Sequence, residues 1–123
     1  MTVSVVTVTY NAADTVADAV QSVIRQKGDF RLDYHIVDGG SNDGTLEQIE
    51  PFQDRITEIT TGPDEGLYNA MNRGVARAKG DIVGILNADD RYADERVIAD
   101  VLGAFEATDA DAVSYTHLTL PTN

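Results

Sequence analysis

The chain has 123 residues, and its 9 basic and 21 acidic side chains give a formal net charge of −12. One domain is expected at this length, and a hydrophobic content of 42% suffices for a buried core. The sequence contains no cysteine, which excludes disulfide scaffolds, thiolate zinc sites and thiol catalysis. The acidic balance argues against binding to bare nucleic acid or anionic membranes, so a phosphorylated ligand would have to arrive with a cation.

The N-terminal residues 1–9 have no basic lead and no small-residue cleavage site, so they do not form a secretion signal. No apolar stretch approaches the roughly 20 residues that are needed to span a bilayer. We therefore expect a cytoplasmic protein, with peripheral attachment at the inner membrane face left open as an alternative.

Strand-like and helix-like segments alternate along the chain. Residues 3–9 form a nearly continuous β-branched run, which is typical of a strand buried on both faces. A helix is predicted from Asp14, as its cap, to about Lys27, with Gly28 at the C-terminal cap. Further strands are expected at residues 33–37, 55–60 and 82–86 and near 112, and further helices just before Pro51, at 67–78 and at 95–105.

This alternation predicts an α/β fold, a mostly parallel sheet with helices on both faces, because helical crossovers join parallel strands. The carboxyl ends of parallel strands share one edge, and ligands bind beyond that edge where the strand order reverses. Polar clusters follow four of the strands, at residues 9–11, 38–44, 62–66 and 87–90. We expect all four on one edge, which makes that edge the predicted site.

Four aspartates can converge at this edge: Asp38, Asp64, Asp89 and Asp90. Crowded carboxylates repel one another, so the cluster favours a bound cation or a bound proton. Oxygen ligands suit Mg²⁺ or Mn²⁺, and Mg²⁺ is usually held by one or two carboxylates together with substrate phosphates. A nucleoside diphosphate would complete such a site.

Four segments, in order, resemble the motifs of family 2 glycosyltransferases with the GT-A, nucleotide-diphospho-sugar transferase fold. They are residues 6–11 (VTVTYN), 36–45 (IVDGGSNDGT), 63–74 (PDEGLYNAMNRG) and 80–90 (GDIVGILNADD). The resemblance implies that residues 1–113 are an incomplete nucleotide-sugar-binding region, a half-domain. Residues 114–123 resemble no glycosyltransferase segment and are interpreted as a non-native tail.

The resemblance implies a role for each matching residue at the nucleotide. Thr9 and Tyr10 would line the nucleotide pocket. Asp38 would contact the uracil or the ribose of the donor, and Asp64 would lie against the nucleotide near the base.

The DXD motif of the family, which holds the metal, corresponds to residues 87–89. Asp89 would coordinate the metal on the diphosphate, with Asp90 beside it in support. Asn87 stands at the first position, where its amide oxygen keeps a ribose or water contact but one charge near the metal is lost.

The implied reaction moves a sugar from a nucleotide-sugar, a UDP-sugar by family habit, to an acceptor hydroxyl with inversion. The resemblance places it in the synthesis of cell-surface glycans, on a glycan or lipid-linked acceptor. The metal would act as a Lewis acid on the departing diphosphate. A carboxylate must serve as general base, but the family places it past the DXD strand and no residue of this chain matches it.

Two alternatives stay open. The first is a donor-binding fragment without turnover, and the second is an acidic, receiver-like phosphoacceptor domain. A receiver needs an acidic pair after its first strand and a late lysine, whereas residues 9–11 are Thr-Tyr-Asn and no lysine follows Lys79. A dinucleotide oxidoreductase is weaker still, because no GxGxxG follows the first strand.

Other polar residues are expected to be structural. His35 is predicted to be a packed strand residue, and Asp43 a cap for the helix near Thr45. Arg73 and Arg77 are four residues apart, which favours a solvated helix face over a diphosphate clamp.

Overall fold

The computed structural model describes residues 1–62 and 67–108. Its elements run in the order β1 (Thr2–Thr9), α1 (Val16–Ile24), β2 (Arg31–Asp38), α2 (Thr45–Ile49), the 3₁₀ helix η1 (Glu50–Arg55), β3 (Glu58–Thr61), α3 (Leu67–Arg77), β4 (Ile82–Asn87) and α4 (Val97–Thr108). Asp64, the strand expected near residue 112 and the tail at 114–123 lie outside the described residues.

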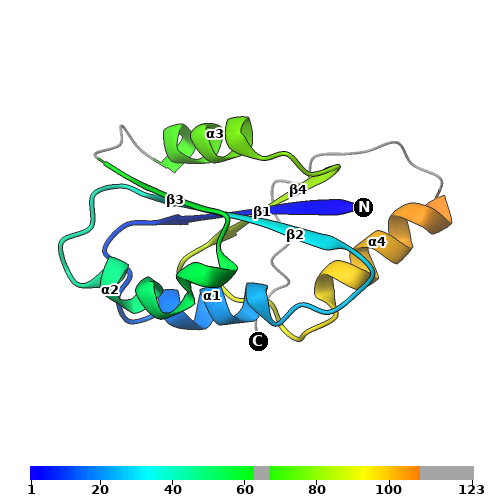
Figure 1. Cartoon of the computed structure of the whole chain (residues 1–123), viewed down its shortest axis with the longest axis horizontal. Coiled ribbons are helices and arrows are strands. Elements are labelled where there is room, and N and C mark those ends of the chain that lie inside the picture. The colour runs from blue at the N-terminus through cyan, green and yellow to red at the C-terminus, as the bar shows by residue number, and fades with distance from the viewer. Residues whose placement is uncertain (63–66, 109–123) are drawn as a thin grey trace.

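The described strands form one sheet with the order β3-β2-β1-β4, and every neighbouring pair is parallel. Helix α3 lies on one face of this sheet, and α1, α2 and α4 lie on the other (Figure 1). The predicted α/β fold, with helices on both faces of a parallel sheet, is confirmed.

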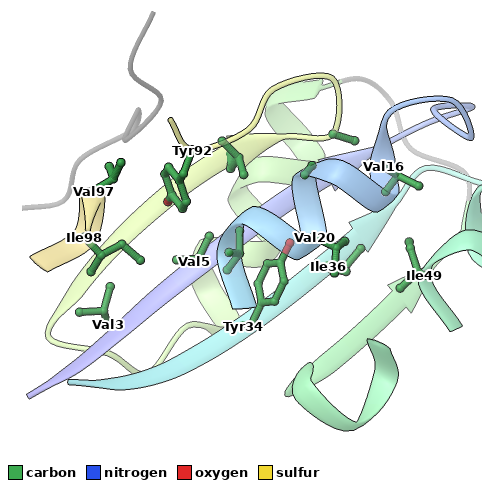
Figure 2. Close-up of a cluster of buried hydrophobic side chains, with 14 of the residues drawn as sticks. Val3, Val5, Val16, Val20, Tyr34, Ile36, Ile49, Tyr92, Val97 and Ile98 are labelled. Carbon is green, nitrogen blue, oxygen red and sulfur yellow. The ribbon is translucent and has the colours of Figure 1, made fainter. Parts of the chain in front are cut away.

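The larger core fills the face that α1 covers. Side chains from α1, the strands and the start of α4 meet there (Figure 2), among them Val16, Val20, Val5, Ile36 and Ile98. Alternate strand residues point to the other face, where α3 covers a smaller cluster made of Val6, Val8, Val37 and Ile85 with Met71 beside it. Burial on both faces explains the continuous β-branched run of β1.

Helix α1 is shorter at both ends than the sequence predicts. It begins after Thr15, whose side chain makes no capping hydrogen bond, so Asp14 is not the cap. It ends at Ile24 because the chain turns toward the segment before α4, where the Lys27 amide donates to the carbonyl of Glu95 at 2.8 Å. In residues 1–62 and 67–108, no helix is long and apolar enough to cross a membrane.

Strand β3 begins later than predicted. Residues 50–55 form η1, with Pro51 in its first turn, where the missing amide hydrogen costs nothing. The strand is therefore confined to Glu58–Thr61.

Candidate active site at the carboxyl edge of the sheet

The register of the sheet brings the strand ends together. Thr9 pairs with Asp38, Asp38 pairs with Thr61, and Val8 pairs with Asn87. The clusters that follow β1, β2 and β4 therefore share one edge, as predicted. The fourth cluster begins next to Thr61, but residues 63–66 lie outside the described residues.

The strand order reverses at β1. The chain passes from β1 outward to β2 and β3 and then crosses to β4 on the other side of β1. The carboxyl ends of β1 and β4 therefore flank the switch point at which α/β sheets bind ligands. Thr9 and Asn87 end these two strands.

Both residues present a polar atom that the described part of the chain leaves unsatisfied. Thr9 Oγ1 and Asn87 Oδ1 are buried and have no hydrogen-bond partner there. Buried polar groups in folded proteins are nearly always hydrogen-bonded. Asn87 pairs with Val8 and shares the face that α3 covers, whereas Thr9 follows Val8 and points to the opposite face. Each of these two strand ends therefore has its own buried polar atom that a ligand at the switch point can engage.

The carboxylate of Asp38 is fully buried and faces the protein. It accepts hydrogen bonds from the Gly40 amide (3.0 Å), the Ser41 amide (2.9 Å), the Ser41 hydroxyl (2.5 Å) and the Thr61 hydroxyl (2.9 Å). Gly40 has a φ of 92°, which the turn requires and which glycine adopts readily. Asp38 thus holds the β2–α2 loop, and its contact with a uracil or a ribose stays a prediction.

Tyr10 is an exposed large hydrophobic side chain at this edge, with 63% of its surface accessible. It follows Thr9, which is only 2% exposed and whose carbonyl accepts the Gly39 amide at 2.9 Å. The phenol ring therefore leaves the edge of a rigid strand and is available to a ligand.

The turn after β4 carries the carboxylates predicted to hold a metal. The Asp90 amide donates to the Asn87 carbonyl at 3.0 Å and closes the turn. Asp89 is exposed and Asp90 half-buried. Among the described residues no group of three or more His, Cys, Asp or Glu is placed to hold a metal. Carboxylates and an amide oxygen are nonetheless the donors that Mg²⁺ and Mn²⁺ prefer, and phosphate oxygens would fill the remaining positions.

His35 and Asp43, which were expected to have structural roles, make contacts within the fold. His35 is buried, and its Nε2 lies 2.9 Å from Asp33 Oδ1. Asp43 accepts the Thr45 amide, the first of α2, at 3.1 Å, although Gly44 occupies the N-cap position. The hydrogen bond from the Thr45 hydroxyl is the main reason why the pKa of Asp43 lies below its ordinary value.

The expectation of a solvated helix face is confirmed for Arg77 of α3 and is wrong for Arg73. Arg77 is half-exposed, but its Nη1 donates to Glu58 Oε1 at 2.8 Å. The Nε and Nη2 atoms of Arg73 are buried. The Arg73 atoms are buried because α3 approaches the sheet closely at Gly74, which also places the side chains next to Gly74 near the sheet.

The sequence patterns did not single out Thr61 or Asp33. Thr61 reaches Asp38 only because β3 pairs with β2, which a single chain segment cannot reveal. Asp33 lies at the opposite, amino edge and accepts hydrogen bonds from the Ser4 hydroxyl (2.6 Å) and the Lys79 amide (3.0 Å). Burial raises the pKa of Asp33, but these bonds and His35 outweigh burial and leave the pKa below its ordinary value.

Comparison with known proteins identifies the family and the fold of the chain. The chain matches the model of Glycosyl transferase family 2 over residues 4–119. It is 34% identical over 103 residues to an uncharacterized glycosyltransferase of Mycobacterium tuberculosis, a match that covers 84% of this chain and 39% of the relative. It is 36% identical over 98 residues to the putative teichuronic acid biosynthesis glycosyltransferase TuaG of Bacillus subtilis, covering 77% of this chain and 38% of TuaG. The chain thus spans about two fifths of the length of these relatives.

Solved structures share the fold at low sequence identity. Residues 1–349 of TarS from S. aureus, in complex with UDP-GlcNAc, superpose with a TM-score of 0.77 at 21% identity over 87% of this chain and 32% of that chain. The mannosyltransferase PcManGT from Pyrobaculum calidifontis, in complex with GDP-Man and Mn²⁺, gives 0.75 at 24% identity over 84% of this chain and 32% of that chain. With the family model matched over nearly its whole length, the chain belongs to glycosyl transferase family 2.

Proposed function

We propose that this chain binds a nucleotide-sugar donor, a UDP-sugar, at the carboxyl edge of its sheet. The complete protein would then transfer the sugar to an acceptor hydroxyl with inversion. The acceptor is a glycan or a lipid-linked glycan precursor, as in the synthesis of cell-surface glycans. The observation that carries the proposal is the switch point of the sheet, where β1 and β4 end in Thr9 and Asn87 and each side chain has a buried polar atom without a partner among the described residues.

Three features of the edge support a nucleoside diphosphate as the ligand. Tyr10 offers an exposed aromatic surface for a base. Thr9 and Asn87 offer buried polar atoms for hydrogen bonds. The related folds were solved with UDP-GlcNAc and with GDP-Man, so donors of this class suit the architecture.

A divalent cation is the natural third component, because a diphosphate and a chain of net charge −12 repel each other. Asp89 would hold Mg²⁺ or Mn²⁺, with Asp90 in support, and PcManGT was solved with Mn²⁺. The ion supplies Lewis-acid stabilisation of the departing diphosphate. The chain's own residues would bind and orient the donor, with Tyr10 at the base and Asn87 at the ribose or at a water molecule.

Transfer with inversion also requires a general base at the acceptor hydroxyl. None of the residues placed at this edge is assigned that role. Donor binding is therefore what we propose for this chain by itself, and turnover for the complete protein.

Calorimetric titration of UDP, with and without Mn²⁺, tests the proposal on the wild-type chain, on Asp89→Ala and on Asp29→Ala. Asp29 is exposed and precedes β2, at the opposite edge, so its variant makes the same charge change away from the site. We expect Mn²⁺-dependent binding that weakens roughly 10–100-fold in Asp89→Ala, as for the loss of a charged contact. Asp29→Ala should bind as the wild type does. Equal affinity with and without Mn²⁺, or equal effects of the two substitutions, would refute the proposed metal-assisted site.

A further inference from the structure

The turn that carries Tyr10 is held by side chains from a distant loop. Three consecutive backbone amides of the β1–α1 turn donate to side chains that lie at least 30 residues away, in the β2–α2 loop and at the first residue of α2. The bonds are Asn11 to Ser41 Oγ (2.8 Å), Ala12 to Thr45 Oγ1 (2.9 Å) and Ala13 to Asp43 Oδ2 (3.2 Å). The two loops therefore form one hydrogen-bonded unit.

The bond between Asn11 and this loop runs in both directions. The Asn11 amide donates to Ser41, and Asn11 Oδ1 accepts the Asn42 amide at 2.9 Å. Asn11 has a φ of 47°, the left-handed conformation that asparagine tolerates better than most residues but that still has to be held in place. Its two bonds to the β2–α2 loop hold it.

Ser41 links this turn to the buried carboxylate. Its hydroxyl donates to Asp38 Oδ1 at 2.5 Å and accepts the Asn11 amide at 2.8 Å. Hydrogen bonds to a carboxylate are strong and polarise the donor, which makes the Ser41 oxygen a better acceptor. Asp38 is itself fixed by Thr61 of β3. A continuous set of bonds thus runs from β3 through Asp38 and Ser41 to Asn11.

We infer that Ser41 and Asn11 are positioning residues for the nucleotide base, acting through Tyr10; the inference rests on the proposed donor binding. Tyr10 lies between Thr9, buried at the end of β1, and Asn11, held by Ser41. The backbone on both sides of the exposed ring is therefore fixed before a ligand arrives. A ring that is already oriented loses little freedom on binding a base, and this raises affinity.

A double-mutant cycle on UDP affinity in the presence of Mn²⁺ tests the inference. Tyr10→Ala should weaken binding about tenfold, in the range of an aromatic stacking contact. Ser41→Ala should weaken binding about threefold to tenfold in the wild-type background and less than twofold in the Tyr10→Ala background, because the ring it orients is gone. Ser41→Thr, which keeps the hydroxyl, should restore most of the affinity.

Ser4 provides a matched control. Its hydroxyl also bridges a carboxylate and an amide, donating to Asp33 at 2.6 Å and accepting from Gly80 at 2.7 Å, but at the amino edge. Ser4→Ala should lower the unfolding midpoint and leave UDP affinity unchanged.

The outcomes separate this inference from the proposal beneath it. Failure of the wild-type chain to bind UDP overturns the proposed function. Binding that Tyr10→Ala leaves intact overturns the positioning role and the contact of Tyr10 with the base, but not donor binding itself. Ser41→Ala that weakens UDP binding equally in the wild-type and Tyr10→Ala backgrounds also overturns the positioning role, because a purely structural serine acts independently of the Tyr10 ring.

Discussion

Gly74 sets the distance between α3 and the sheet, and an alanine there should force them apart. A Cβ atom at this position would lie 2.2 Å from Val6 Cγ1 and 3.3 Å from Val37 Cγ2. Both valines are buried in the cluster that α3 covers. A comfortable carbon–carbon contact is about 3.5–4.0 Å, so the overlap with Val6 exceeds what a small side-chain adjustment can relieve.

Two opposing effects set the size of the change. Alanine is about 1 kcal/mol better than glycine inside a helix. Overpacking a core costs typically about 1–3 kcal/mol, and the 2.2 Å approach to Val6 places Gly74→Ala at the upper end of that range. The free energy of unfolding should therefore fall by about 1–2 kcal/mol.

Urea unfolding of Gly74→Ala beside Gly103→Ala measures this difference. Gly103 also lies within a helix, α4, but it is exposed and a Cβ atom there would meet nothing within 4 Å. Gly103→Ala should raise the free energy of unfolding by about 0.5–1 kcal/mol. If the two variants change stability in the same direction and by the same amount, the steric argument for Gly74 is wrong.

Three further predictions concern polar contacts of the sheet. Tyr34→Phe should lower the free energy of unfolding, measured by thermal denaturation, by about 1–2 kcal/mol. The substitution removes the phenol oxygen that lies 2.7 Å from the buried Thr7 hydroxyl and leaves that hydroxyl without its partner. An unchanged free energy of unfolding would contradict this prediction. The pKa of Asp33 is lower in the folded chain, so its stabilising contribution is present above pH 3.8 and is lost as the pH falls through the folded-state pKa. The free energy of unfolding, measured from neutral to acidic pH, should therefore fall less steeply in Asp33→Asn than in the wild type. The same decrease in both proteins would show that Asp33 does not contribute to the acid sensitivity. The Arg77 hydrogen bond is the main reason that the pKa of Glu58 is below its ordinary value. Arg77→Gln should therefore raise the pKa of Glu58, measured by NMR titration of its carboxyl carbon. An unchanged pKa would show that the Arg77–Glu58 pair does not persist in solution.

The shared edge could be predicted from the sequence because it depends only on order and direction. Parallel strands joined by helices all point the same way, so residues that end strands, such as Thr9, Asp38 and Asn87, must meet at one edge whatever the strand order. The position of β1 between β2 and β4, and hence the location of the switch point, follows from pairing across the sheet. No local pattern encodes that pairing.

Where prediction failed, a distant segment decided the outcome. Helix α1 ends at Ile24 because the amide of Lys27 binds the carbonyl of Glu95, almost seventy residues later. Arg73 was expected on a solvated helix face, but its Nε and Nη2 atoms are buried because Gly74 allows α3 to pack close to the sheet. Each case is a tertiary contact that overrides a local preference.

The acidic residues that the structure describes at this edge divide into two kinds, and only one kind suits the metal-binding role that we propose. The carboxylate of Asp38 is buried behind four donors, and that of Asp43 is bound to Thr45 and Ala13. A carboxylate whose lone pairs are already occupied can shape a loop, but it has little capacity left for a cation. Asp89 is exposed. Among the described residues, the exposed carboxylate that we propose as a ligand of a bridging cation therefore lies after β4, next to the switch point, where Asn87 Oδ1 has no partner. Under the proposed function, this separation would let one acidic edge hold its own loops rigid and also accept an anionic donor through a metal ion.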